Sequence, residues 1–272
     1  MRLALLQTEP ISREPERALA RLAAAVRDTA AAGAGLLLTP EMFLTGYNIG
    51  AEAVANLAEP RDGALCRAVA TLARENGIAL LYGYPEREGG RIYNSIQLVD
   101  AEGEAVANYR KTHLYGNVDR QQFSAGDRLG VPVDFAGWPV ALSICYDIEF
   151  PEVARSQAAA GAELLLCPTA NMIPYDSIAT RLVPARAEEN TVFAAYANYC
   201  GAEGDFTYCG LSCVVGPDGE DIARAGRDET LLIADLDRNH LSRSRADASH
   251  LKDRRPALYS GVISPMGESH DR

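Results

Sequence analysis

The sequence predicts an α/β protein built from two similar halves, and two observations carry this prediction. Along the 272 residues, short apolar runs of strand length alternate with segments whose apolar residues recur at helical spacing. In addition, residues 31–40 match residues 159–168 at eight of ten positions. Each copy holds a helix end, a Gly stop, a Leu-Leu-Leu run and a closing Pro. We therefore expect one equivalent helix–strand unit in each half, with Glu41 and Thr169 at equivalent strand ends.

The first half opens on a strand and continues with helix–strand pairs. Apolar runs bounded by Gly or Pro indicate buried strands, and apolar residues three and four apart, followed by Gly33 or Gly77, indicate helices. An Asp-Ala-Glu-Gly segment at 100–103 separates two further strand-like runs, which we expect to pair as a hairpin. The expected strands are 3–7, 36–38, 78–84, 94–99 and 105–109, and the expected helices are 12–32 and 63–77.

The second half repeats this alternation. Pro151 is suited to a first helical position and Gly161 to a helix end, so a helix is expected between them. A Gly-Pro-Asp-Gly turn at 216–219 is expected to join the last two strands. The expected strands are 140–144, 164–166, 191–197, 211–215 and 230–236, with a further helix at 177–190.

The chain is expected to form a single domain over residues 1–272, because no Pro/Gly/Ser-rich linker interrupts it. Residues 237–272 differ from the rest: they are polar, rich in Arg and Asp, and only weakly periodic. We expect this segment to be an arm that packs on a neighbouring subunit rather than a part of the core.

Composition limits the classes of partner and cofactor. The formal net charge of −11 argues against nucleic acid and against an acidic membrane surface. No apolar run approaches the roughly 20 residues of a membrane span, and the N-terminal residues lack the features of a signal peptide. The six cysteines show no CxxC or zinc-site spacing, so we expect reduced thiols in a cytoplasmic protein. No phosphate-binding or dinucleotide-binding motif occurs, and we expect no cofactor and no metal.

Three reactive side chains each follow a predicted buried strand: Glu41, Lys111 and Cys145. Singly, each has an ordinary interpretation, as a loop carboxylate, a solvated cation and a small buried hydrophobe respectively. Together, they can converge, because functional side chains of α/β folds gather at the carboxyl ends of strands. The sequence therefore favours a site made of a carboxylate, an amine and a thiol.

This trio suits attack by sulfur on an unactivated carbon–nitrogen bond. A cysteine has an unperturbed pKa of about 8.5, so a buried carboxylate is needed to take its proton. A lysine ammonium can hold the developing oxyanion and favour the thiolate, as can a helix starting just after Cys145. A Cys–His mechanism is the competitor, but His113, the one histidine near Lys111, has no evident Asn or Asp partner in the sequence.

Three segments around these residues resemble the signature blocks of the nitrilase (carbon–nitrogen hydrolase) superfamily. The blocks are Pro-Glu-Met-Phe-Leu-Thr-Gly-Tyr at 40–47, Tyr-Arg-Lys-Thr-His-Leu at 109–114 and Ile-Cys-Tyr-Asp-Ile-Glu-Phe-Pro-Glu at 144–152. The resemblance spans nearly the whole chain and implies a four-layer α-β-β-α sandwich that dimerises into an eight-layered stack. It implies Glu41 as general base, Lys111 as oxyanion stabiliser with the backbone N–H of Tyr146, and Cys145 as a nucleophile that forms a thioester.

The chain departs from the family pattern at one position. Family members often carry a second glutamate in the loop after the lysine, four residues before an aromatic residue. Here Asp119 stands there, with Phe123 four residues on. We expect its shorter side chain to reach the substrate or Lys111, and a surface-loop position is the alternative.

The branch of the superfamily follows from the residues after the nucleophile. Cys-Tyr-Asp resembles amidases and carbamoylases, whereas nitrilases usually carry Trp-Glu there. We expect an amidase that cleaves non-peptide carbon–nitrogen bonds of small linear carboxamides, with Tyr47, Asn171 and Met172 lining its pocket. The alternatives are an N-carbamoyl amidohydrolase, with Arg120 or Arg181 as a clamp for an acidic substrate, and a nitrilase. A binding protein without activity would be expected to lack one of the three reactive residues.

Overall fold

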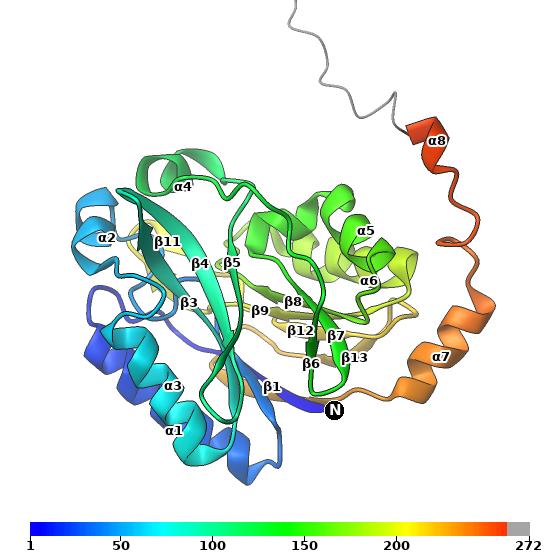
Figure 1. Cartoon of the computed structure of the whole chain (residues 1–272). Coiled ribbons are helices and arrows are strands. Elements are labelled where there is room, and N and C mark those ends of the chain that lie inside the picture. Colours follow the sequence, from blue (N-terminus) through cyan, green and yellow to red (C-terminus); the bar gives the residue numbers. More distant parts are fainter. Residues whose placement is uncertain (260–272) are drawn as a thin grey trace, which may run out of the picture.

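The computed structural model describes residues 1–259, which contain two six-stranded sheets packed face to face (Figure 1). The first sheet has the order β14-β1-β2-β3-β4-β5 and the second β13-β12-β9-β8-β7-β6. The first contains β1 (Arg2–Gln7), β2 (Leu36–Leu38), β3 (Ala79–Glu88), β4 (Arg91–Val99), β5 (Ala105–Arg110) and β14 (Thr230–Asp235). The second contains β6 (Val133–Phe135), β7 (Trp138–Leu142), β8 (Leu164–Pro168), β9 (Phe193–Ala197), β12 (Cys213–Val215) and β13 (Asp221–Arg224).

Helices cover the outer face of each sheet, which gives four layers. In Figure 1, α1 (Pro15–Ala31) and α3 (Ala64–Asn76) lie against the first sheet, and α5 (Pro151–Ala159) and α6 (Val183–Asn190) against the second. Three apolar clusters fill the three interfaces, and the central one joins side chains such as Leu5, Leu38 and Leu166 from both sheets. Burying each such leucine contributes about 1.5–3 kcal/mol to stability. The expected α-β-β-α sandwich is confirmed.

The two halves repeat one topology. The three central strands run parallel in each sheet, β1-β2-β3 in the first and β7-β8-β9 in the second. Antiparallel strands flank them on both sides, so β2 and β8 hold equivalent places. These are the strands of the repeated sequence segment. At their ends the backbone N–H of Glu41 donates to the carbonyl of Thr169 at 3.2 Å, which joins the halves at equivalent positions.

The structure corrects three expectations about local elements. Strand β7 ends at Leu142, two residues earlier than predicted, and Cys145 begins a 3-10 helix, Cys145–Glu149, before α5 starts at Pro151. The turn at 216–219 leads into the unpredicted strand β13, which pairs with β12, so it does not join β12 to β14. Two helices occur where none was predicted, α2 (Ala51–Leu57) and α4 (Gly116–Gln122), and α4 holds Asp119, which was expected in a loop. These elements are short, and seven residues are too few to show helical periodicity.

Two short features lie outside the two main sheets and the helices that cover them. A two-stranded ribbon joins β10 to β11, and a π-helical turn precedes α6. Their bounds are β10 Ala202–Glu203, β11 Phe206–Thr207 and Ile178–Leu182 for the π-helical turn. No helix of the described residues is long and apolar enough to cross a membrane.

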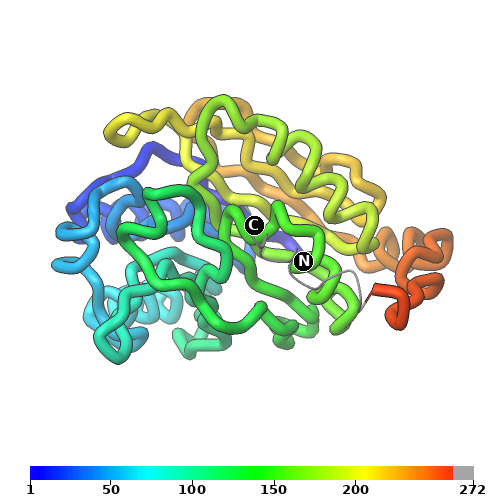
Figure 2. The backbone as a smooth tube through the Cα atoms, turned by 90° about the horizontal axis from the view of Figure 1, so that it is seen from above, coloured from blue at the N-terminus to red at the C-terminus, as the bar shows by residue number. Residues whose placement is uncertain are grey.

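After β14 the chain stays packed on the sandwich at Leu241, which is buried in the central apolar cluster, so the expectation that residues 237–272 form no part of the core is wrong at this position. Helices α7 (Arg238–Asp247) and α8 (Pro256–Tyr259) run outward along one end of the molecule in both views (Figures 1 and 2). Leu258 and Tyr259 remain 53% and 40% exposed. The expected arm thus begins with helices, and its residues 260–272 lie outside the described part of the chain.

Candidate active site

Glu41 and Lys111 meet inside the sandwich although they come from different strand ends. Glu41 lies three residues beyond β2, and Lys111 directly follows β5. Nζ of Lys111 lies 2.7 Å from Oε1 of Glu41, and neither side chain is exposed to solvent. The charges of both groups act on the thiol of Cys145. The structure therefore brings the predicted carboxylate, amine and thiol into one place.

Glu41 keeps one carboxylate oxygen free. Its Oε1 accepts hydrogen bonds from Lys111 and from Nδ2 of Asn94, at 2.7 and 2.6 Å. Its Oε2 is buried and has no hydrogen-bond partner among the described residues. A buried carboxylate oxygen without a donor lowers the stability of the fold, so its presence indicates a functional role. Oε2 is thus available to accept a proton.

Asp119 completes the surroundings of the lysine. Its Oδ2 lies 2.7 Å from Nζ of Lys111 and accepts the backbone N–H of Tyr115 at 2.8 Å. Its Oδ1 accepts the hydroxyl of Tyr47 at 2.9 Å. The side chain is fully buried on α4. The surface-loop alternative for Asp119 is therefore wrong, and the shorter side chain does reach Lys111.

Burial and the neighbouring charges together shift the pKa values of this cluster. It raises the pKa of Glu41 above the ordinary 4.5, with Lys111 opposing and Asp119 adding to the rise. Burial alone would lower the pKa of Lys111, but the charges of Asp119 and Glu41 outweigh it and raise that pKa well above 10.5. The cluster thus holds a permanent ammonium between two carboxylates.

The thiol of Cys145 differs from the sequence-based expectation. Burial, followed by the charge of Glu41, raises its pKa well above the ordinary 9.0, and Lys111 only partly offsets this. We expected a thiolate-favouring position at the start of a helix, but Cys145 precedes α5 by six residues and occupies a short 3-10 turn instead. The thiol therefore keeps its proton at rest and depends on a base to remove it.

The backbone at Cys145 is strained, and hydrogen bonds with Asp147 and Arg186 hold the turn that it begins. Its φ is 46°, a left-handed conformation that costs a non-glycine residue about 1–3 kcal/mol. Oδ2 of Asp147 accepts the backbone N–H of Ile144 at 3.1 Å, and Arg186 donates to the carbonyls of Ile148 and Glu149 at 3.0 and 2.8 Å. Both ends of the 3-10 turn are thus fixed, which sets the direction of the thiol.

His113 has the partner that the sequence did not reveal. Its backbone N–H and its Nδ1 lie 2.9 and 2.8 Å from Oδ1 of Asp147, and its ring stacks on Phe150 at 4.0 Å. The expectation that it lacks an Asp partner is wrong. However, His113 does not line the pocket beside Cys145. Its contacts make it part of the support beneath the 3-10 turn.

A cavity of about 230 Å³ opens beside Cys145. The three residues expected in the pocket, Tyr47, Asn171 and Met172, line it, and so does Tyr146, whose backbone N–H was expected in the oxyanion hole. The backbone N–H of Asn171 donates to Oδ1 of Asn198 at 2.9 Å, which fixes the position of Asn171. The other lining residues are Tyr115, Glu149, Ala170 and Tyr175; Glu149 lies in the 144–152 signature block, whereas no periodicity or motif points to the other three.

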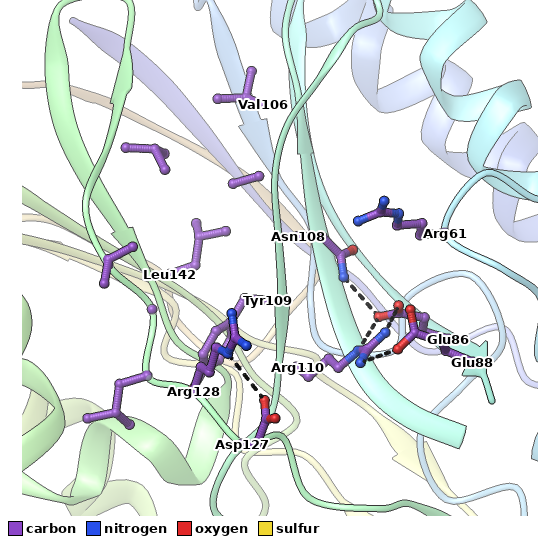
Figure 3. A pocket seen from close by; sticks show the side chains of 15 residues that line it. Arg61, Glu86, Glu88, Val106, Asn108, Tyr109, Arg110, Asp127, Arg128 and Leu142 are labelled. Carbon is purple, nitrogen blue, oxygen red and sulfur yellow. Dashed lines mark hydrogen bonds and ion pairs between the residues drawn. The ribbon is translucent and has the colours of Figure 1, made fainter. Parts of the chain in front are cut away.

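A larger cavity of about 560 Å³ lies elsewhere, between β5 and the segment before β6. Figure 3 shows Val106 and Leu142 at one end and the ion pairs of Arg110 with Glu86 and Glu88 at the other. The Glu86 carboxylate is already bound by several donors, and no thiol lines this cavity. It therefore lacks the thiol on which the expected attack at a carbon–nitrogen bond depends. Within the described residues, no group of three His, Cys, Asp or Glu side chains could hold a metal ion.

Comparison with known families agrees with this geometry. Residues 2–246 match the family model described as carbon-nitrogen hydrolase. The chain belongs to the carbon–nitrogen hydrolase family. All three reactive residues lie within the matched range.

Two bacterial proteins are similar to this chain over most of its length. A protein of Pseudomonas protegens, described as a hydrolase in the pqqF 5′ region, is 52% identical and covers 96% of this chain and 92% of its own length. An (R)-stereoselective amidase of a Pseudomonas species is 40% identical and covers 85% of this chain and 83% of its own.

Among solved structures, the amidase of Nesterenkonia sp. superposes on this carbon–nitrogen hydrolase with a TM-score of 0.89. It is 36% identical, over 97% of this chain and 96% of its own. One variant of that enzyme, with glutamine for glutamate at its position 41, carries the acetamide moiety of fluoroacetamide covalently on the active-site cysteine. Its position 145 holds a cysteine that was replaced by alanine in another variant. Both positions carry the same residue types and numbers as Glu41 and Cys145 here.

Proposed function

We propose that this carbon–nitrogen hydrolase is an amidase, which converts a small linear carboxamide and water into a carboxylic acid and ammonia. The observation that carries the proposal is the buried Glu41–Lys111 pair, with Oε2 of Glu41 unpartnered and the charge of Glu41 acting on the thiol of Cys145. The covalent acetamide on the cysteine of the Nesterenkonia amidase supports a covalent route.

In the first half-reaction, Oε2 of Glu41 takes the proton of the Cys145 thiol while sulfur attacks the amide carbon. The carbonyl oxygen becomes an oxyanion, held by the Lys111 ammonium and the backbone N–H of Tyr146. The protonated Glu41 then gives its proton to the amide nitrogen. The carbon–nitrogen bond breaks, ammonia leaves, and a thioester on Cys145 remains.

The second half-reaction uses the same groups. Glu41, again ionised, takes a proton from water, and the hydroxide oxygen attacks the thioester carbon. The same donors hold the second oxyanion, the carbon–sulfur bond breaks, and the thiolate recovers its proton from Glu41. The carboxylic acid leaves. Asp119 keeps Lys111 charged throughout, because its carboxylate raises the pKa of the ammonium.

The pocket supports an amide over an N-carbamoyl amino acid. A carbamoyl amino acid carries a carboxylate, which an enzyme usually binds with a cation. Among the residues that line the described cavity there is no Lys or Arg. Arg120 and Arg181, the clamps considered from the sequence, are exposed and lie outside it.

Ammonia release from matched panels of short amides, N-carbamoyl amino acids and nitriles tests this function. We expect release from amides by the native protein and none by Cys145→Ala, because the nucleophile is gone. Release from carbamoyl compounds or nitriles instead would overturn the substrate class while keeping the nucleophile. Release by Cys145→Ala would overturn the mechanism.

We propose further that the protein is a cytoplasmic homodimer. The C-terminal segment from residue 237 supports a dimer, because its apolar side chains Leu258 and Tyr259 are exposed and a partner subunit could bury them. The six free cysteines, five of them buried, support a reducing compartment. Sedimentation of the full chain is expected to give a dimer, and a chain ending at residue 247 is expected to dissociate more readily. A monomeric full chain would contradict the dimer.

A further inference from the structure

Glu149 lines the cavity beside Cys145, and its carboxylate has no partner among the described residues. It ends the 3-10 turn that begins at Cys145, and both residues line the same cavity. Arg186 binds the backbone carbonyl of Glu149 at 2.8 Å, which fixes the residue without pairing its side chain. Among the described residues, no donor forms a hydrogen bond or an ion pair with the Glu149 carboxylate. The mechanism above leaves this carboxylate without a role.

Tyrosine rings surround this end of the cavity. Tyr115 packs edge-on against Tyr146, with ring centroids 5.4 Å apart, and against Tyr175 at 6.3 Å. All three rings line the cavity together with Glu149. Aromatic faces attract cations, and several rings beside a carboxylate form the usual surroundings of a bound ammonium group. A neutral, apolar acyl group of a substrate would gain no binding energy from the carboxylate.

We propose that Glu149 and its tyrosine neighbours form a subsite for a protonated amine carried on the acyl part of the substrate. The favoured substrates are then amides of amino acids, whose ammonium group lies at Glu149 while the amide carbon lies at Cys145. This inference rests on the proposed amidase function and names its substrate class.

The charges around the cavity agree with a cationic substrate. Two cations lie near Glu149, and both are engaged elsewhere: Lys111 is enclosed by Glu41 and Asp119, and Arg186 donates to backbone carbonyls of the 3-10 turn. Burial raises the pKa of Glu149, and the charges of Lys111 and Arg186 oppose this rise without forming an ion pair with its carboxylate. An ammonium group supplies an ion-pair partner, whereas an anionic acyl group is repelled by the same carboxylate.

Three amides of similar size test the subsite in the full-length protein: 3-aminopropanamide is cationic, butanamide neutral and succinamate anionic. For the native protein we expect kcat/KM to fall in that order. Glu149→Gln keeps the shape and removes the charge, so the ratio of kcat/KM for the cationic to the neutral amide should drop about tenfold. Glu149→Lys should reverse the order of the cationic and anionic amides. Glu152→Gln, an exposed neighbour on α5, should leave the ratio as it is.

The outcomes separate this inference from the function on which it rests. Ammonia from none of the three amides would overturn the amidase function itself. Ammonia from butanamide without a preference for 3-aminopropanamide would overturn the subsite alone. An equal fall on both substrates in Glu149→Gln would also overturn it, because a purely structural role affects every substrate alike. A selective loss on the cationic amide supports it.

Discussion

Nζ of Lys111 lies 2.7 Å from Oδ2 of Asp119, with both side chains fully buried. The same ammonium lies 2.7 Å from Glu41, so one buried cation is shared by two carboxylates. Taking these charges out of water is expensive, and their mutual attraction repays the cost only in this geometry. Removing Lys111 would leave two buried carboxylates without a cation, and removing either carboxylate would take one acceptor from the buried ammonium.

Asp119→Asn is expected to weaken both stability and turnover. Asparagine has one acceptor oxygen in place of two, so either Lys111 or the Tyr47 hydroxyl loses its acceptor, which should lower the free energy of unfolding by about 3 kcal/mol. Misplacement of Lys111 should lower kcat/KM about 100-fold. Denaturant unfolding and steady-state ammonia release measure the two effects. Unchanged kinetics in a folded variant would show that Asp119 does not position Lys111.

The acid limb of the pH profile is expected to report Glu41. The base must be ionised to act, and burial raises its pKa above 4.5, so kcat/KM should fall with decreasing pH through a value higher than that of an ordinary glutamate. No alkaline loss from Cys145 is expected below pH 9, because the pKa of that thiol is also raised. Glu41→Gln should lose about 1000-fold in kcat/KM. A profile that stays flat down to pH 4.5 would contradict the assignment.

Gly83 on β3 is expected to tolerate no side chain. A Cβ there would lie 2.3 Å from the backbone nitrogen of Met42, next to Glu41. Gly83→Ala should therefore destabilise the protein by about 1–3 kcal/mol and lower turnover by displacing Glu41. Gly35→Ala is the matched control, because a Cβ at Gly35 meets nothing within 4 Å. Equal melting temperatures for the two variants would show that the close approach does not matter.

Glu203 is expected to position Tyr47. Its buried carboxylate accepts the backbone N–H groups of Tyr47 and Asn48, at 3.1 and 2.7 Å, and the hydroxyl of Tyr208 at 2.5 Å. Glu203→Gln turns an acceptor into a donor there, which should cost about 1.5–3 kcal/mol of stability and lower kcat more than it raises KM. Asp205→Asn, at the exposed side of the same loop, is the control. A loss of stability with kcat retained would limit Glu203 to a structural role.

The sequence predicted the architecture because its signals are local. The Leu-Leu-Leu runs of β2 and β8, each ended by Pro, mark the centre of each sheet and reveal the repeat. Glu41, Lys111 and Cys145 were predicted in the same way, as reactive residues after buried strands.

What the sequence could not predict depends on contacts across the fold. Asp147 holds His113 from a distant segment, and no local pattern connects the two residues. The raised pKa of the Cys145 thiol follows from burial, which only the packed sandwich creates. Glu149 lines the cavity as the last residue of the 3-10 turn before α5, and periodicity in a single sequence does not reveal so short a turn.

The most direct measurement is the intact mass of the protein after an acid quench during turnover of a small amide. We expect an added acyl group in place of one hydrogen, located by peptide mapping on Cys145 and removable by hydroxylamine, as a thioester requires. The Cys145→Ala protein should show neither this mass nor ammonia release. An acyl group on a different residue, or turnover retained by Cys145→Ala, would contradict the assignment of Cys145 as the nucleophile.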